Sequence, residues 1–320
     1  MALVSLSDDK FRLENSGEAE LSKVTPQRTK LVLNLISVYI LWGSTYLFMH
    51  FMTERMPPLY MAGCRLLTAG LILYPFARFT GHARPNKQEW LAAGLIGILL
   101  LSVANGGMTV AVHYIPTGVA ALLAGMLPLF IVILNWLTFS KVRPTKLVMA
   151  GLAVGLVGIA LLVKPGGFRT TTTESWVGIG LIMVCNLAWA TGTLLSGRMK
   201  LPTQMVSIAV QMLVGGGLLL LVSLVVEPVT LTSIGQAPTK AIGALIYLII
   251  FGSLIGFSSF SWLARNAPPQ ILSTYAYVNP VVAMLLGWAF AGEALTGQSL
   301  VSALIILAGV VLISFGKRRG

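Results

Sequence analysis

Long apolar stretches with almost no charged residues alternate with short polar segments along most of the chain. These stretches cover residues 31–53, 56–77, 90–140, 147–163, 175–197, 201–226, 241–264, 266–292 and 294–316. About 20 apolar residues in a helix cross the hydrocarbon core of a bilayer, which is about 30 Å thick. The stretch 90–140 is too long for one helix and divides naturally at residues 114–118, Tyr-Ile-Pro-Thr-Gly. The pattern predicts an all-α integral membrane protein with ten transmembrane helices.

The amino-acid composition excludes a soluble fold. Of the 320 residues, 56% are hydrophobic and only 10% are charged, whereas soluble domains carry about 25% charged residues. The same richness in apolar residues excludes an intrinsically disordered chain. Residues 1–30 are polar and mixed in charge, without the apolar segment that a signal peptide needs. We therefore expect the first apolar stretch to remain in the membrane.

Basic residues outnumber acidic ones by 22 to 10, and their positions predict the orientation of the helices. Cytoplasmic loops of membrane proteins are enriched in Lys and Arg. With the N-terminus inside, the cytoplasmic segments hold Lys10, Arg12, Lys23, Arg28, Lys30, Arg78, Arg84, Lys87, Lys141, Arg143, Lys146, Arg198, Lys200, Arg265, Lys317, Arg318 and Arg319. The opposite side holds only Arg55, Lys164, Arg169 and Lys240. This asymmetry predicts two cytoplasmic termini, and it explains the positive charge without a nucleic-acid partner.

The chain also contains a weak internal repeat. A shift of 152 residues places Pro116, Ala124, Pro128, Leu134 and Trp136 on Pro268, Ala276, Pro280, Leu286 and Trp288. A shift of 147 residues places Trp42 on Trp189. Both shifts pair the first predicted helix with the sixth and the fourth with the ninth. Because each copy holds five spans, an odd number, the second copy enters the membrane upside down, as in the inverted repeats of secondary transporters.

Several short motifs resemble the EamA family of the drug/metabolite transporter superfamily, and in particular its YedA-like permeases. The opening motif combines Trp42-Gly43-Ser44-Thr45-Tyr46 with Pro57-Pro58 and Arg65. Further motifs are Asn105-Gly106-Gly107, Pro128-Leu129-Phe130, the run from Tyr275 to Pro280, and Gly292-Glu293. The similarity covers about residues 35–316. It departs at Val112-His113, where relatives carry a Glu-His pair.

The resemblance implies a bundle of two inverted five-helix repeats that works as a secondary transporter. Such a protein would export small metabolites or amino acids across the bacterial inner membrane. Residues 1–30 would form a polar cytoplasmic tail, residues 31–163 the first repeat, residues 175–316 the second, and residues 317–320 a basic cytoplasmic tail. The direction of transport is implied by the resemblance alone.

Two repeat-related helices offer matching polar and aromatic faces. The first predicted helix carries Tyr39, Trp42 and Tyr46, and the sixth carries Asn186, Trp189 and Thr193. Each set has the i, i+3, i+7 spacing of one helical face. We expect the two faces to line a central substrate cavity. The alternative is that both Trp residues pack in an apolar core.

Two further helices carry polar residues that are candidates for the same cavity. Asn105 and Thr109 lie about one turn apart in the third helix, with Gly106-Gly107 between them. The alternative there is close packing of small residues between helices. Tyr275 and Asn279 share a face of the ninth helix, just before Pro280. A proline frees the carbonyl four residues earlier, so this segment can bind substrate or simply form a kink.

Few charged residues lie inside the predicted spans. Arg65 is the one cation, and we expect its long side chain to reach the nearer interface as an anchor. Glu54 and Glu293 lie at span ends, where we expect them to face water. The absence of a central carboxylate argues against the proton relays of pumps. His113 is then the best candidate for proton coupling, because imidazole titrates near physiological pH; the alternative is an inert interfacial histidine.

The motifs favour a transporter over an enzyme. The chain lacks an HExxH motif, a GxSxG motif and a P-loop. Cys64 and Cys185 have no metal-type spacing, so we expect no cofactor and no metal. The alternatives to a secondary exporter are a channel-like facilitator or a multidrug efflux permease, with a membrane enzyme a distant third. The expected partners are a small neutral or aromatic substrate and the lipid bilayer, with the chain acting as a monomer or a weak homodimer.

Overall fold

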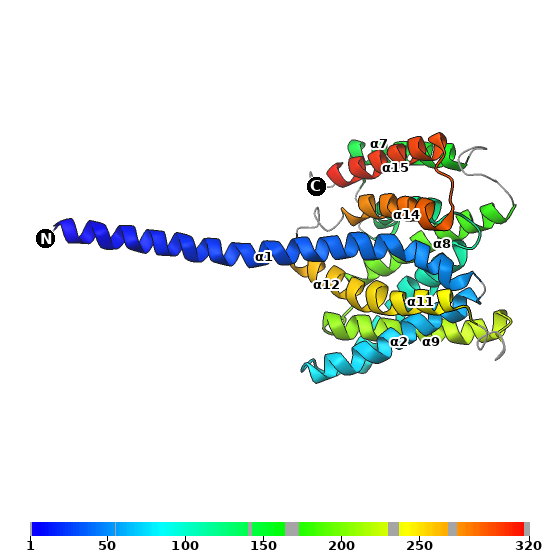
Figure 1. The fold of residues 1–320 in the computed structure, drawn as a ribbon, viewed down its shortest axis with the longest axis horizontal. Helices are drawn as coiled ribbons and strands as arrows, with labels where there is room; N and C mark the ends of the chain where they lie inside the picture. Colours follow the sequence, from blue (N-terminus) through cyan, green and yellow to red (C-terminus); the bar gives the residue numbers. More distant parts are fainter. Residues whose placement is uncertain are drawn as a thin grey trace.

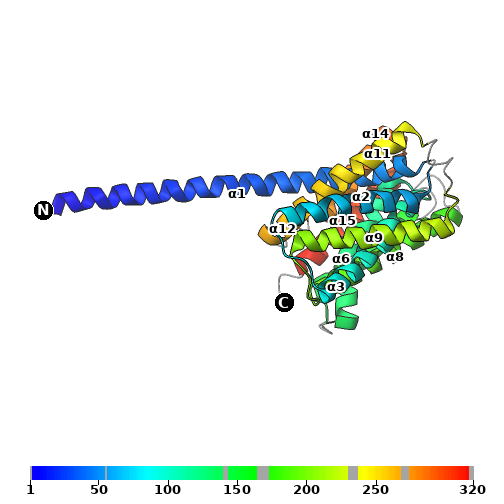
Figure 2. The same ribbon diagram turned by 90° about the horizontal axis from the view of Figure 1, so that it is seen from below.

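The computed structural model describes residues 2–54, 56–139, 143–163, 173–229, 237–267 and 274–316. Every regular element in these ranges is helical, as the all-α prediction requires. The first helix, α1 (Ala2–Thr53), extends far beyond the bundle at its N-terminal end (Figures 1 and 2). The segment that the sequence predicts as a polar tail therefore continues the first helix. The predicted basic tail, residues 317–320, lies outside the described residues.

The helices have the length and composition of membrane spans. Seven helical stretches are long and apolar enough to cross a bilayer: Arg28–Thr53, Pro58–Phe79, Lys87–Ala111, Thr117–Phe139, Thr173–Ser196, Gln204–Val226 and Thr239–Phe260. Three apolar helices are shorter: Lys146–Leu162, Val278–Ala291 and Gly297–Ile313. Large apolar side chains such as Phe79, Val225 and Phe290 are exposed on the surface. Such a surface suits lipid rather than water, so the protein is a multi-pass membrane protein.

Two of these helices change geometry near the middle. One consists of α3 (Lys87–Gly97), η1 (Ile98–Gly106) and α4 (Gly107–Ala111), of which η1 is π-helical. The other consists of α11 (Thr239–Tyr247), the π-helical η3 (Leu248–Ile255) and α12 (Gly256–Asn266). The two π-helical stretches begin at corresponding places in the two predicted repeats. Such stretches are rare and are frequent at functional sites.

A third helix is interrupted, and its repeat-related partner contains a proline. The first comprises α5 (Thr117–Ala124), α6 (Leu127–Leu134) and η2 (Asn135–Phe139), with a break between α5 and α6. Pro128 at the start of α6 cannot donate to the Ala124 carbonyl. The partner is α14 (Tyr275–Ala291), which contains Pro280. A Cβ on Gly125 would lie 3.3 Å from the Pro280 ring, so the break and the proline meet in space.

Repeat-related helices also pack side by side at two edges of the bundle (Figure 1). At one edge α2 (Pro58–Phe79) packs along α9 (Gln204–Val226), and at the other α7 (Lys146–Val163) packs along α15 (Gly297–Gly316). Glycines bring the backbones together. A Cβ on Gly216 would overlap the backbone nitrogen of Leu67, and one on Gly309 would lie 2.7 Å from that of Gly155. Between these edges lie α1 and α14, and α8 (Thr173–Ser196) packs against η1, α5 and α6.

Two carboxylates hold helix ends in place. Glu227, which follows α9, accepts hydrogen bonds of 2.8 and 2.9 Å from two backbone N–H groups at the start of α2. Glu293, which follows α14, accepts two such bonds at the start of α5. A carboxylate at a helix N-terminus satisfies free N–H groups and complements the helix dipole. The expectation that Glu293 simply faces water is therefore wrong, because this carboxylate joins the end of one helix to the start of another.

Candidate functional site

A cavity of about 120 Å³ lies where helices of the two predicted repeats meet. This volume is several times the space that one water molecule requires. The lining consists of Trp42, Thr45, Tyr46, Met49, Arg65, Ala104, Asn105, Met108, Ala124, Leu127, Cys185, Asn186, Trp189, Phe257, Tyr275 and Asn279. These residues come from α1, α2, η1, α4, α5 and α6 in the first repeat and from α8, α12 and α14 in the second.

Aromatic rings form one part of the cavity wall. The ring of Trp42 stacks on Phe260 at a centroid distance of 4.9 Å, and it meets Phe257 and Tyr275 edge-on at 5.2 and 5.6 Å. Such offset and edge-to-face pairs stabilise aromatic clusters beyond their burial. Trp189 instead packs against the small residues Ala104, Cys185 and Ala188. The two repeat-related Trp residues therefore both line the cavity, in different surroundings.

Asparagine side chains supply the polar part of the lining. Asn186 Nδ2 donates a hydrogen bond of 2.9 Å to the Leu123 carbonyl, close to the break between α5 and α6. The Asn279 amide, turned so that its nitrogen donates, lies 3.3 Å from the carbonyl oxygens of Tyr39 and Tyr275. Both amides are nearly fully buried. Each side chain thereby joins two helices, Asn186 linking α8 to α5 and Asn279 linking α14 to α1.

Among the described lining residues, Arg65 is the one that carries a charge. Its side chain is 1% exposed, so it does not reach the interface. Its Nε donates a hydrogen bond of 3.0 Å to Ser253 Oγ on η3, and its Nη1 lies 3.5 Å from Asn105 Oδ1 on η1. The expectation of an interfacial anchor is therefore wrong. A lone charge in an apolar stretch was a visible signal, but sequence could not show that the side chain turns inward.

The structure brings seven of the ten predicted cavity residues to the lining: Trp42, Tyr46, Asn105, Asn186, Trp189, Tyr275 and Asn279. The other three lie elsewhere. The Tyr39 hydroxyl hydrogen-bonds to that of Thr274, and the buried Thr109 hydroxyl donates to the Asn105 carbonyl at 3.0 Å. Thr193 is exposed. The sequence placed Asn105 and Thr109 on one face, and the structure keeps them one turn apart, but it is Met108 that joins Asn105 in the lining.

Other lining residues were not predicted from the sequence to line the cavity. They are mostly apolar: Thr45, Met49, Ala104, Met108, Ala124, Leu127, Cys185 and Phe257. Apolar residues in apolar helices give no local signal, because every face of such a helix looks alike. The repeat could have indicated Phe257, since a shift of about 150 residues takes Asn105–Met108 to Ile255–Ser258.

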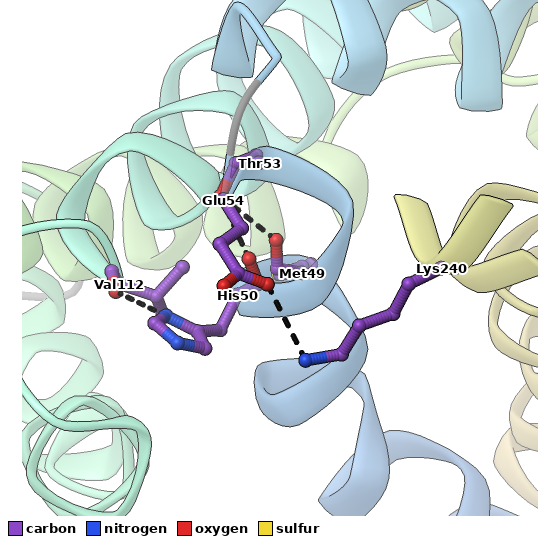
Figure 3. A network of polar contacts seen from close by, with 6 residues as sticks. All are labelled: Met49, His50, Thr53, Glu54, Val112 and Lys240. Carbon is purple, nitrogen blue, oxygen red and sulfur yellow. Dashed lines mark hydrogen bonds and ion pairs between the residues drawn. The ribbon is translucent and has the colours of Figure 1, made fainter. Parts of the chain in front are cut away.

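One end of the bundle is held by contacts between α1, the end of α4 and α11 (Figure 3). Lys240 Nζ lies 3.3 Å from Glu54 Oε2 and 3.7 Å from the centre of the Phe51 ring. His50 Nδ1 lies 3.4 Å from the Val112 carbonyl oxygen. The neighbouring residue His113 is exposed in the turn after α4 and does not line the cavity. Its part in proton coupling stays a prediction.

The described residues form no cluster of metal-binding side chains. Within the described ranges, three or more His, Cys, Asp or Glu side chains nowhere gather closely enough to hold a metal ion. Of the described residues that line the cavity, Cys185 is the only cysteine, and none is a carboxylate or a histidine. The polar and aromatic groups in this lining are aromatic rings, amides, hydroxyls, one thiol and one guanidinium group.

Comparison with known proteins relates these features to a family. The EamA-like transporter family matches residues 29–164 and, a second time, residues 176–315. The inner membrane transporter YedA of Escherichia coli K12, itself described as uncharacterized, is 38% identical over 284 residues, which are 88% of this chain and 90% of that protein. A probable terminal-alkyne amino-acid exporter of Streptantibioticus cattleyicolor is 26% identical, with 91% of this chain and 96% of that protein covered.

Structural similarity points the same way for the fold. A solved crystal structure superposes with a TM-score of 0.63 at 20% sequence identity, over 91% of this chain and 98% of that chain. At this level of identity the similarity concerns the fold alone. The two family matches cover nearly all of the helical bundle, one per predicted repeat. The chain therefore belongs to the EamA-like transporter family.

Proposed function

We propose that this protein is a secondary transporter that exports small metabolites across the bacterial inner membrane by alternating access. The observation that carries the proposal is the cavity lined by residues of both repeats, with Trp42 and Trp189 from repeat-related helices. Secondary transporters bind their substrates near the bilayer midplane, at the interface between their repeats. Family membership and the transporter names of its relatives support the same function.

The proposed architecture has ten transmembrane helices in two inverted repeats, with both termini in the cytoplasm. Seven long and three shorter apolar helices support the number of spans, and the family matches each half once. An odd number of spans per half makes the halves inverted. The basic residues concentrate on one side of this topology. A reporter enzyme fused to the C-terminus should be active only in the cytoplasm, and activity confined to the periplasm would contradict the topology.

Irregular helices next to the cavity support alternating access. The break between α5 and α6, the proline in α14 and the π-helical stretches η1 and η3 all lie beside or within the lining. Broken helices are typical of transporter binding sites. Their free backbone groups are tolerated there because they are buried in protein or line the cavity and do not face lipid. They also give a helix places where it can bend. We propose that these helices move when the two repeats rock around the cavity.

The proposed substrates are amino acids or related neutral or aromatic compounds. Aromatic rings and buried amides suit such compounds, and one relative is named as an amino-acid exporter. A multidrug efflux permease is the second candidate, because the aromatic cluster around Trp42 would also accept amphipathic drugs. A channel-like facilitator is the third. We further propose that the protein acts as a monomer embedded in the bilayer.

Counterflow in liposomes tests the proposed function. Purified protein would be reconstituted with unlabelled phenylalanine, leucine or threonine inside, and uptake of the labelled compound would be followed. A carrier gives transient, saturable accumulation of label, whereas a pore gives unsaturable flux without accumulation. Growth of overexpressing cells on toxic amino-acid analogues and on amphipathic drugs distinguishes the amino-acid exporter from the drug permease. Unsaturable flux of every compound would contradict the proposal.

A further inference from the structure

We infer that Arg65 is the group that binds a carboxylate of the substrate, so that the cavity takes monocarboxylates with an apolar or aromatic side group. The inference rests on the proposed function in one respect, namely that the cavity is the substrate site. It then goes further and names the chemical class and the residue that selects it.

The guanidinium group of Arg65 is held in place by both repeats. Its Nε donates to Ser253 Oγ at 3.0 Å, and its Nη1 lies 3.5 Å from Asn105 Oδ1. Ser253 belongs to the π-helical η3 and Asn105 to the π-helical η1. Gly252 leaves room for the head group, because a Cβ there would lie 3.1 Å from Nη2. Arg65 is thus positioned by the two irregular stretches that correspond in the repeats.

The charge of Arg65 is left without a compensating anion. Both of its partners are neutral oxygens, and among the residues that the structure describes no Asp or Glu lines the cavity. Among the described residues the only ion pair joins Lys240 and Glu54, outside the cavity lining. A buried cation in a membrane is costly unless it is paired. A guanidinium group has five N–H donors, and the two contacts of Arg65 leave donors available to a ligand in the cavity.

The rest of the lining restricts which anion fits. A phosphate or a dicarboxylate carries about two charges and would need a second cation, but within the described part of the chain Arg65 is the only Lys or Arg in the lining. A single carboxylate matches one guanidinium group and can bind it with two parallel hydrogen bonds. The lining also offers Trp42, Trp189 and Phe257 for an apolar or aromatic group. The site therefore fits a monocarboxylate with one such group, which includes neutral amino acids.

Matched probes separate charge recognition from general binding. The protein in lipid nanodiscs would be titrated with 3-phenylpropanoate and with its amide, 3-phenylpropanamide. The intrinsic fluorescence of its seven Trp residues would be followed, of which Trp42 and Trp189 line the cavity. A second pair, 4-methylpentanoate and its amide, replaces the aromatic group. A hydrogen-bonded charge contributes about 1.5–3 kcal/mol, so we expect the wild type to bind each carboxylate roughly tenfold or more tightly than its amide.

Three substitutions identify the residue responsible. Arg65→Gln should bind carboxylate and amide with less than about twofold difference, because the hydrogen-bonding shape remains and the charge is lost. Arg65→Lys keeps the charge without the fork of donors and should retain an intermediate preference. Arg78→Gln is the matched control, since Arg78 lies in the last turn of the same helix, away from the cavity, and should bind as the wild type does. Thermal unfolding of each variant monitors folding.

The outcomes separate this inference from the proposed function. Equal binding of carboxylate and amide by the wild type, or no binding of either carboxylate at millimolar concentration, overturns the inference. A carboxylate preference that survives in Arg65→Gln also overturns it. If Arg65→Gln does not fold, the other two variants decide. The inference is overturned if folded Arg65→Lys keeps the full preference for carboxylates and Arg78→Gln loses it. Failure of counterflow alongside selective binding would contradict export and leave the carboxylate site standing.

Discussion

The two repeats agree in backbone design and differ in chemistry. Each contains a Trp at the same place in its first helix, a π-helical stretch in its third and a proline in its fourth. The cation is not repeated. Arg65 lies on α2, whereas the repeat-related helix α9 contains no charged residue between Gln204 and Val226.

This difference separates two requirements of a carrier. Features that let helices bend and rock are needed equally on both sides of the membrane, and an inverted repeat supplies them twice. Recognition of an asymmetric small molecule needs each binding group only once. A cavity between the repeats can therefore combine symmetric movement with one-sided chemistry. Substitutions can test the shared backbone contacts and the unshared chemistry of the two repeats separately.

The largest effect is expected where α2 and α9 touch. Gly216→Ala should lower the free energy of unfolding by about 1–3 kcal/mol or more, because its Cβ would overlap the backbone of Leu67. The matched control is the next residue, Gly217, whose Cβ would meet nothing within 4 Å. Gly217→Ala should be neutral or slightly stabilising, as Ala favours a helix. Thermal unfolding in detergent measures both, and equal melting temperatures would contradict the close packing of α2 on α9.

Substitutions of the two repeat-related Trp residues should have different effects on the stability of the fold and similar effects on transport. Trp42→Ala and Trp189→Ala should each reduce counterflow by about fivefold or more, because both rings line the cavity. Trp42 also packs in a cluster of three further rings, so its loss should destabilise the fold by about 2–4 kcal/mol, and the loss of Trp189 by less. Both proteins should remain folded and inserted. Normal transport by both would return these residues to a packing role.

The membrane class, the repeat and seven residues of the cavity lining could be predicted from the sequence. Apolar length and charge placement are local properties, and Trp, Asn and Tyr stand out in apolar helices. Three kinds of information were not local. The inward turn of Arg65 depends on oxygens 40 and 188 residues away. The role of Glu293 depends on the distant start of α5. Thr109 was misplaced because it is buried outside the lining, which depends on how its helix packs against the others.

A smaller effect is expected from the ion pair between the repeats. Glu54 and Lys240 are both about half exposed, at 51% and 54%, and exposed pairs contribute about 0.2–1 kcal/mol. Glu54→Gln and Lys240→Gln should therefore lower stability by no more than this, and high salt should remove the difference. At the corresponding places in the other repeat pair, Lys200 lies four residues beyond α8 and Glu89 lies in the first turn of α3. Glu89 instead caps its own helix through Asn86.

A double-mutant cycle measures this pair directly. The double variant Glu54→Gln/Lys240→Gln should be less destabilised than the sum of the single variants, by the coupling energy of the pair. A coupling above about 2 kcal/mol would show that this end of the bundle is held far more firmly than exposed charges allow. The described contacts, including that of Lys240 with the Phe51 ring, would then not account for the stability of this end of the bundle.

The smallest effect is expected at His113. A coupled carrier must bind a proton on one side and release it on the other, so the titrating group must be reachable from the cavity. His113 is exposed in the turn after α4 and is absent from the lining, and none of the described lining residues is a carboxylate. We therefore expect facilitated or weakly proton-linked export. The flux through His113→Gln should be within about twofold of wild type, because substitutions of exposed residues outside the core and the cavity have small effects. Flux in liposomes with and without an imposed pH gradient measures this, with His50→Gln as the matched control on the neighbouring helix. Accumulation driven by the gradient in the wild type and lost only in His113→Gln would place coupling at that imidazole. Accumulation that survives both substitutions would place it at a group in neither position.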